Sequence, residues 1–204
     1  MFRVGISSKG PITLPQDAEV VLKPEDWEGL DKEQDITIRI KTMQDLTPLV
    51  KNRRLEECAV ERLWFKIRDL ARSTSESERN DTWLFLEAII RGQYDQLDIM
   101  RAEFFRLIKS SVDHGEGSLE QQIHLIDALT QKGREILHFE EEIGVLMQKI
   151  WPYILTSECQ EFRITFLQIV INLLTFNSAY VDSEVVVSFI RAFSKMCSIG
   201  KSFL

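Results

Sequence analysis

The side chains that could perform chemistry in this chain are few and widely separated. There are three cysteines and three histidines, at positions 58, 159 and 197 and at positions 114, 124 and 138. The cysteine spacing matches no disulfide framework, zinc motif or redox motif, and no two histidines stand four residues apart, as in a helical metal site. We expect buried thiols in a reducing compartment and surface or loop histidines, with a Cys–His pair formed in space as the alternative.

Two further motifs resemble catalytic elements only superficially. The run Glu140-Glu141-Glu142 is expected to lie solvated near a helix start, where carboxylates favour the helix dipole. General acid–base catalysis needs two carboxylates in different environments, and nothing separates these three. Residues 115–117 (GEG) lack the Lys-Ser/Thr of a phosphate-binding loop. The sequence therefore predicts no catalytic, cofactor-binding or metal-ligating residue, and we expect no enzyme and no cofactor.

Basic and aromatic residues are the candidates for binding a partner or an anion. Lys51, Arg53 and Arg54 form a small basic group that acidic residues follow directly, so we expect a solvated loop, with phosphate or an acidic partner as the alternative. Tryptophan is common at the centre of protein interfaces. Trp27 lies outside any strong apolar stripe and is the candidate anchor, whereas the stripes place tryptophans 64 and 83 in a core.

Composition limits the class of protein. The chain has 204 residues, 44% of them hydrophobic, 25 basic and 32 acidic side chains, and a net charge of −7. This composition is typical of globular proteins and excludes wholesale disorder, and the low count of 9 Gly and 5 Pro argues against a turn-rich β fold. The acidic charge argues against nucleic acid as a partner. We find no secretory signal and no apolar run long enough to span a membrane, and expect a cytoplasmic or nuclear protein.

Apolar residues recur with helical spacing along most of the chain, which predicts eight helices. Residues 36–40 also alternate like a strand, but the apolar pattern continues too far for one. Ser75, Ser118 and Ser157 have capping-box spacing, and Pro48 should end or kink the first helix. The expected helices cover about 33–48, 59–71, 75–92, 97–109, 118–132, 139–154, 157–176 and 186–197.

The helices repeat at a regular interval. Taken in pairs, they begin near residues 33, 78, 118 and 158, a period of about 40–45 residues that is typical of HEAT or armadillo repeats. The predicted fold class is all-α, a HEAT-type or armadillo-like α-solenoid of about four helical pairs over residues 25–204. An irregular helical bundle is the alternative. Residues 1–24 are expected to form a flexible or loosely docked N-terminal arm.

The last predicted pair is unusually apolar. Residues 162–176 and 185–193 carry apolar side chains on more than one face, whereas the terminal repeat of a solenoid normally turns a polar face outward. We expect this face to be covered, and the chain to be truncated at its C-terminal end. Self-association through the last helix pair, or a closed domain, is the alternative.

Five segments resemble the tuberin family, the GTPase-activator subunits of the tuberous sclerosis complex. They occur in the right order with similar spacing, and the resemblance to the N-terminal domain of that family covers about residues 33–198. The segments are 55–64 (LEECAVERLW), 100–109 (MRAEFFRLIK), 128–134 (ALTQKGR), 139–143 (FEEEI) and 172–182 (NLLTFNSAYVD). The first 25 or so residues do not resemble the family.

The resemblance implies a function for the chain. The N-terminal half of the family is a HEAT-type solenoid that binds the coiled coil of hamartin. A separate C-terminal domain activates GTP hydrolysis by Rheb, a small GTPase, and so restrains growth signalling through the target-of-rapamycin kinase. That domain, with its catalytic asparagine, is not among these 204 residues, so Rheb would be reached only through a missing domain.

No functional residue is carried over from the family. Asn177 matches the solenoid and not the catalytic helix, and the partner-binding residues stay unassigned. We therefore expect a scaffold that binds a hamartin-like coiled coil, cytoplasmic and reaching the nucleus or endomembranes only through partners. The alternative is a free-standing HEAT-type adaptor with another protein partner.

Overall fold

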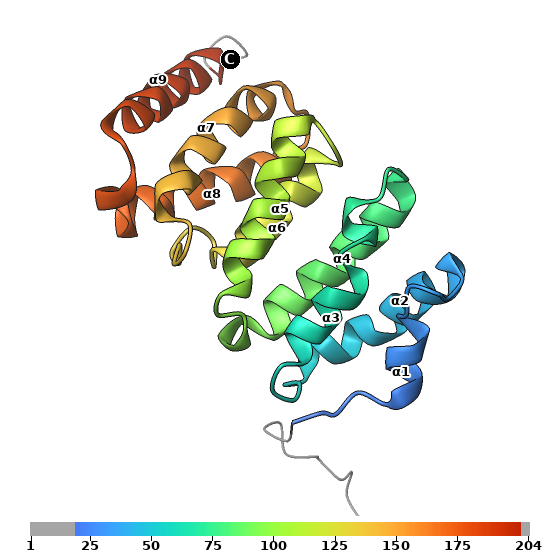
Figure 1. Ribbon diagram of the computed structural model, residues 1–204. Helices are drawn as coiled ribbons and strands as arrows, with labels where there is room; N and C mark the ends of the chain where they lie inside the picture. Colours follow the sequence, from blue (N-terminus) through green and yellow to red (C-terminus); the bar gives the residue numbers. More distant parts are fainter. Residues whose placement is uncertain (1–18, 201–204) are drawn as a thin grey trace, which may run out of the picture.

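A computed structural model describes residues 19–200 as a row of helices (Figure 1). Within these residues the only β contact is an isolated parallel bridge between Val20 and Leu55. Three short 3-10 helices, η1 (Leu70–Arg72), η2 (Tyr94–Gln96) and η3 (Ser178–Tyr180), lie in the connections. The α-helices are α1 (Pro24–Gly29), α2 (Ile36–Asn52), α3 (Ala59–Ile67), α4 (Glu76–Gly92), α5 (Met100–His114), α6 (Leu119–Leu129), α7 (Glu140–Thr156), α8 (Gln160–Phe176) and α9 (Ser183–Gly200).

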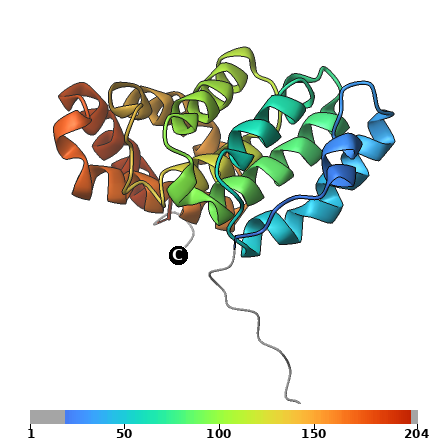
Figure 2. The ribbon, with the colours of Figure 1, turned by 60° about the horizontal axis from the view of Figure 1, so that its bottom comes forward.

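The helices form two layers. Helices α2, α4, α6 and α8 pack successively side by side, while α5 packs on α6, α7 on α8 and α9 on α7. Both views show the pairs laid in a row rather than gathered round a centre (Figures 1 and 2). The predicted α-solenoid is confirmed. The first members of the predicted pairs correspond to α2, α4, α6 and α8, but in space α5 pairs with α6 and α7 with α8.

Aromatic contacts join successive helices of the second layer. The rings of Trp64 on α3 and Phe104 on α5 meet edge to face, with centroids 5.3 Å apart. Phe105 stacks on Phe139, at the start of α7, at 4.5 Å, and Trp151 on α7 contacts Phe189 on α9 at 6.1 Å. Offset and edge-to-face ring pairs add to the stabilisation from burial, so each repeat is fixed to the next through its core.

Pro48 was expected to end or kink its helix and lies inside it instead. Pro48 lies within α2, which continues to Asn52, and Pro152 lies within α7. A proline removes one helical hydrogen bond. The last turn of α2 is retained because Val50, at 0% exposure, is buried in the core, and tertiary packing outweighs local propensity.

The capping boxes predicted the starts of two helices but not the contacts there. Helices α4 and α6 follow Ser75 and Ser118, and neither serine makes a side-chain cap bond. The carboxylate of Glu78 instead accepts from the hydroxyl of Ser73 at 2.6 Å. The third box is wrong by two residues, because Ser157 ends α7 and α8 begins after Cys159.

The described residues ahead of α1, 19–23, pack on the segment that follows α2. The N–H of Val20 donates to the carbonyl of Arg54 at 2.8 Å, and the N–H of Glu56 donates to the carbonyl of Val20 at 3.1 Å. Leu22 is 3% exposed. The expected arm over 1–24 otherwise lies outside the described residues.

The outer face of α8 does not follow the expectation of full coverage. Ile164 and Ile171 are 56% and 50% exposed, and Ile190 on α9 is 57% exposed. Within residues 19–200, the main helical neighbours of α8 are α6 and α7.

Candidate functional site

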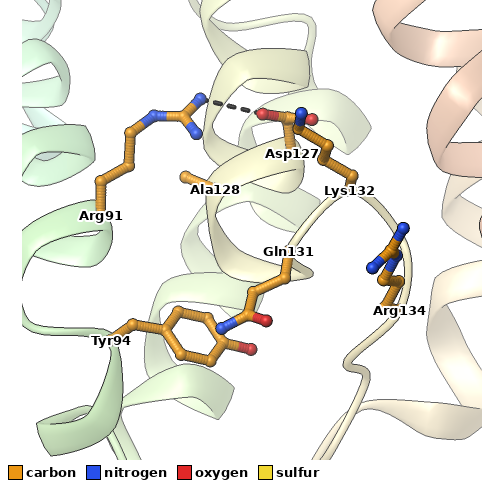
Figure 3. A pocket seen from close by; sticks show the side chains of 7 residues that line it. All are labelled: Arg91, Tyr94, Asp127, Ala128, Gln131, Lys132 and Arg134. Atoms are coloured by element: carbon orange, nitrogen blue, oxygen red, sulfur yellow. Dashed lines mark hydrogen bonds and ion pairs between the residues drawn. The ribbon is translucent and has the colours of Figure 1, made fainter.

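The pocket of Figure 3 lies where α4 and α6 end, and we call it the α4–α6 pocket. Its volume is about 440 Å³, and it opens to solvent between the two helices and the loop that leaves α6. Its lining comes from two separate parts of the chain, residues 91–94 and residues 127–134. The residues are Arg91, Tyr94, Asp127, Ala128, Gln131, Lys132 and Arg134.

Arg91 ties the two helices together at one side of the pocket. Its Nε donates to Glu87 Oε1 at 2.7 Å, and its Nη2 donates to Asp127 Oδ2 at 3.0 Å. Burial disfavours the charged form, but the hydrogen bonds to the two carboxylates outweigh it and raise the pKa of Arg91 above its ordinary value. Arg91 is therefore a fixed cation whose charge its own neighbours balance.

Tyr94 forms the floor of the pocket. Its hydroxyl donates to the carbonyl of Leu129 at 3.3 Å, and the Arg101 guanidinium lies 4.2 Å from the ring centre. Burial raises the pKa of the Tyr94 hydroxyl, with the charge of Arg101 opposing it in part. The hydroxyl stays protonated at neutral pH and acts as a donor.

A left-handed turn positions the free cations of the pocket. Gln131, Lys132 and Gly133 have successive φ values of 45°, 63° and 88°. The buried Thr130 holds the turn, because its hydroxyl accepts from the N–H of Gly133 at 2.8 Å. A Cβ at Gly133 would lie 2.3 Å from the carbonyl oxygen of Ile169 on α8, so only glycine allows α8 this close.

The backbone of this turn is held from α8. Asn172 Nδ2 donates to the carbonyl of Lys132 at 2.8 Å, and Asn177 Nδ2 donates to the carbonyl of Arg134 at 2.9 Å. The Arg134 guanidinium lies 5.3 Å from the ring centre of Phe176. Among the described residues, neither Lys132 nor Arg134 has a carboxylate partner. The pocket thus presents two uncompensated cations on a rigid backbone, which suits it to bind acidic side chains.

We call the contact between the turn after α6 and α8 a joint, and a second joint of the same kind connects α4 to the end of α2. Gln93, 2% exposed, donates through Nε2 to the carbonyls of Val50 and Arg53, both at 2.6 Å. Its Oε1 accepts from the N–H of Leu55 at 2.9 Å. The neighbouring Gly92 is required here as well, because a Cβ would lie 2.0 Å from the carbonyl oxygen of Val50.

The residues singled out by type are dispersed in the structure. His114 is exposed at the end of α5, which continues past the expected end at residue 109, and His138 is exposed. His124 is half-buried on α6, 3.8 Å from Glu120 Oε1. The run at 140–142 lies in the first turn of α7 as expected, and Glu142 pairs with Lys109.

The expectation of buried thiols is wrong for two cysteines. Cys58 and Cys159 are exposed, because each occupies the N-cap position that precedes a helix, α3 and α8 respectively. The side chain of Cys197 lies outside the described residues.

The structure confirms the predictions for Arg54 and for the two core tryptophans. Arg54 is exposed and pairs with Glu19 at 3.5 Å, as a solvated group should. Trp64 and Trp83 are core residues at 7% and 1% exposure, while Trp27 is only half-buried. Trp27 lies in a separate groove.

No part of the described chain gathers three or more His, Cys, Asp or Glu side chains as a metal site would need. In the same residues, no helix has the length and apolar character to cross a bilayer. The α4–α6 pocket itself offers cations, a phenolic donor and an amide. It is built for recognition of an acidic group.

Sequence reasoning named Trp27 as a candidate anchor but singled out no residue of this pocket. One signal was available, since Lys132 and Arg134 flank the glycine that ends an amphipathic helix, where cations favour the helix dipole. That signal does not reveal that Arg91, from another repeat, lies beside them.

Comparison with known proteins includes a family profile and a solved structure. The profile of the family described as "Domain of unknown function (DUF3384)" matches residues 36–202. A solved structure described as "Structure of the TSC2 N-terminus" is similar over 85% of this chain, with a TM-score of 0.69 and 16% sequence identity. The chain spans 45% of the length of that structure. The match confirms, at the level of the fold, the resemblance to the tuberin N-terminal domain.

Proposed function

This chain belongs to the DUF3384 family, and we propose that it is the N-terminal scaffold portion of a tuberin-like subunit. In this role it binds a hamartin-like coiled coil. The observation that carries the proposal is the shared solenoid fold, which extends over 85% of the chain. A solenoid presents a long surface that stacked repeats hold rigid, and such surfaces serve protein binding.

The α4–α6 pocket is the contact surface we assign to this partner. Coiled coils expose charged side chains beside their apolar seam. Lys132 and Arg134 have no carboxylate partner among the described residues, and hydrogen bonds from Asn172 and Asn177 hold the backbone that carries them. Acidic residues of a coiled coil would therefore meet cations already in position, which favours fast and specific association.

Through this partner the chain would act in negative regulation of target-of-rapamycin signalling. In a tuberin-like subunit, the activation of a Rheb-type GTPase belongs to a C-terminal domain, and we assign no step of GTP hydrolysis to the residues described here. The proposed location is the cytoplasm, with contact to endomembranes through partners only.

Binding to the purified coiled coil of a hamartin-like protein tests the proposal. We expect the charge reversals Lys132→Glu and Arg134→Glu together to weaken binding at least about tenfold. Lys41→Glu is the matched control, since Lys41 is exposed on α2, away from the pocket. Absence of binding by the wild-type chain would count against the partner. Substantial stimulation of GTP turnover by this chain alone would count against a scaffold role.

A second function rests on a different observation. Ile164, Ile171 and Ile190 are exposed apolar side chains on α8 and α9. They favour a free-standing adaptor that self-associates through these two helices. Light scattering separates the two functions. An adaptor of this kind dimerises, and Ile171→Glu with Ile190→Glu abolishes the dimer. A wild-type monomer at high concentration would exclude it.

A further inference from the structure

A groove between α1 and α3, near the N-terminal end of the row in Figure 1, is built on two aromatic side chains. Trp27 on α1 is half-buried against the core, and Phe65 on α3 is 57% exposed. The groove has a volume of about 500 Å³ and is also lined by Glu61, Arg62 and Lys66. We call it the α1–α3 groove.

Cations surround both rings. The Arg62 guanidinium lies 4.0 Å from the ring centre of Trp27. Two cations lie near the ring of Phe65, with the Arg68 guanidinium at 4.6 Å and the Lys32 ammonium at 5.5 Å from its ring centre. Apolar surface rimmed by charged side chains is typical of interaction sites, and aromatic and arginine side chains are enriched at them.

The charge of the groove is not evenly balanced. Arg62 pairs with Glu56 at 3.2 Å, and Lys66 pairs with Asp31. Among the described residues, Lys32 and Arg68 have no carboxylate partner. Glu61 is the acidic residue in the lining, one position before Arg62. The excess positive charge therefore lies at the Phe65 end, beside the exposed ring.

We propose that the α1–α3 groove binds an acidic amphipathic helix of a partner protein. An apolar side chain of that helix fills the space between Trp27 and Phe65, and its carboxylates reach Lys32 and Arg68. Helices dock in this way in apolar grooves through anchors three or four residues apart. Aromatic and arginine side chains are the types that contribute most to such interfaces.

An RNA strand is the other ligand that aromatic rings and cations attract, and the groove favours it less. The Arg62 guanidinium already occupies a face of Trp27 on which a base would stack. The inference does not depend on the coiled-coil partner proposed above, because it concerns a separate surface and a different set of cations.

Fluorescence anisotropy with the full chain tests the proposal. The probes are two labelled designed helices of about 18 residues, long enough to retain helicity. Both carry leucines on one face, and the flanking positions are glutamate in one and lysine in the other. We expect the glutamate helix to bind at least about tenfold more tightly than the lysine helix.

Variants locate the binding. Phe65→Ala and Arg68→Glu should each weaken the glutamate helix by about tenfold, and both positions are exposed, so the fold is retained. Leu84→Ala removes a comparably exposed apolar side chain on α4, 56% exposed, and should leave binding unchanged. Equal binding of both helices, or wild-type affinity in Phe65→Ala, would overturn the proposal. Displacement of the glutamate helix by a labelled oligouridine that binds more tightly would overturn it as well.

Discussion

Gln93 should contribute more to stability than any exposed polar side chain of this protein. It donates to the carbonyls of Val50 and Arg53 and accepts from the N–H of Leu55, and its side chain is 2% exposed. Gln93→Ala leaves these backbone groups without a partner in or near the core. An unsatisfied buried group costs about 1–3 kcal/mol. Because the Leu55 N–H and the Val50 carbonyl are buried while the part-buried Arg53 carbonyl can recruit water, we expect a total loss of about 3 kcal/mol.

Urea unfolding followed by circular dichroism measures this loss. Gln93→Met keeps the volume of the side chain and removes its hydrogen bonds, so it separates bonding from packing and should lose nearly as much as Gln93→Ala. Gln44→Ala is the control, because Gln44 makes one exposed hydrogen bond, to Asp81 at 3.3 Å, and should change stability by less than about 0.5 kcal/mol.

Hydrogen exchange gives a local readout of the same joint. Since stability in a repeat array is partly local, the amide of Leu55, bonded to Gln93 Oε1, should lose protection in Gln93→Met before amides of α7 and α8 do. A Gln93→Met chain with wild-type stability and an unchanged Leu55 amide would refute the reasoning.

Two further predictions concern the turn after α6 and an ion pair under α2. Gly133→Ala should lower the free energy of unfolding by more than about 2 kcal/mol, because it combines a positive φ with overlap on the Ile169 carbonyl. Gly115 is the control: it has φ +67° but open space around it, so Gly115→Ala should lose only about 1 kcal/mol. Equal losses in the two variants would contradict this. The buried Arg39 donates to both oxygens of Asp69; burial of Asp69 opposes its ionisation, but Arg39 outweighs this and holds the pKa of Asp69 below its ordinary value of 3.8. Asp69→Asn should therefore lower the free energy of unfolding by about 1–2 kcal/mol at neutral pH. This loss should shrink as pH falls below 3.8 and through the lowered pKa of Asp69, where the wild-type carboxylate is protonated. Urea unfolding at several pH values measures the loss, and a loss independent of pH would contradict the assignment.

The helices of this fold were predictable because their apolar stripes are local. Periodicity gave the fold class, the interval between repeats and most helix starts. It could not give the pairing, since a regular interval is the same whichever helix is counted first. Packing in space decides that α5 pairs with α6. Likewise, a proline predicts a helix end from local geometry, whereas the burial of Val50 retains the last turn of α2.

The α4–α6 pocket depends on contacts that no local pattern contains. Lys132 and Arg134 are positioned by a turn whose carbonyls are bound by Asn172 and Asn177, more than 35 residues later in the chain. The exposure of Cys58 was missed for a related reason. Cysteine is usually buried, but this one occupies a left-handed N-cap position at φ 62°, which turns it out of the core.

The two joints share a design that bears on binding. In each, a glycine lets two neighbouring helices of the layer formed by α2, α4, α6 and α8 approach closely; the glycine is Gly92 in one joint and Gly133 in the other. A buried amide side chain, Gln93 or Asn172 respectively, donates to a carbonyl near the end of the preceding helix of that layer. A joint held by backbone contact leaves little freedom for adjacent repeats to rotate. The α1–α3 groove and the α4–α6 pocket are therefore fixed relative to each other. Because no repeat must be reordered on binding, a partner that contacts both surfaces avoids much of the entropic cost that a flexible array would impose.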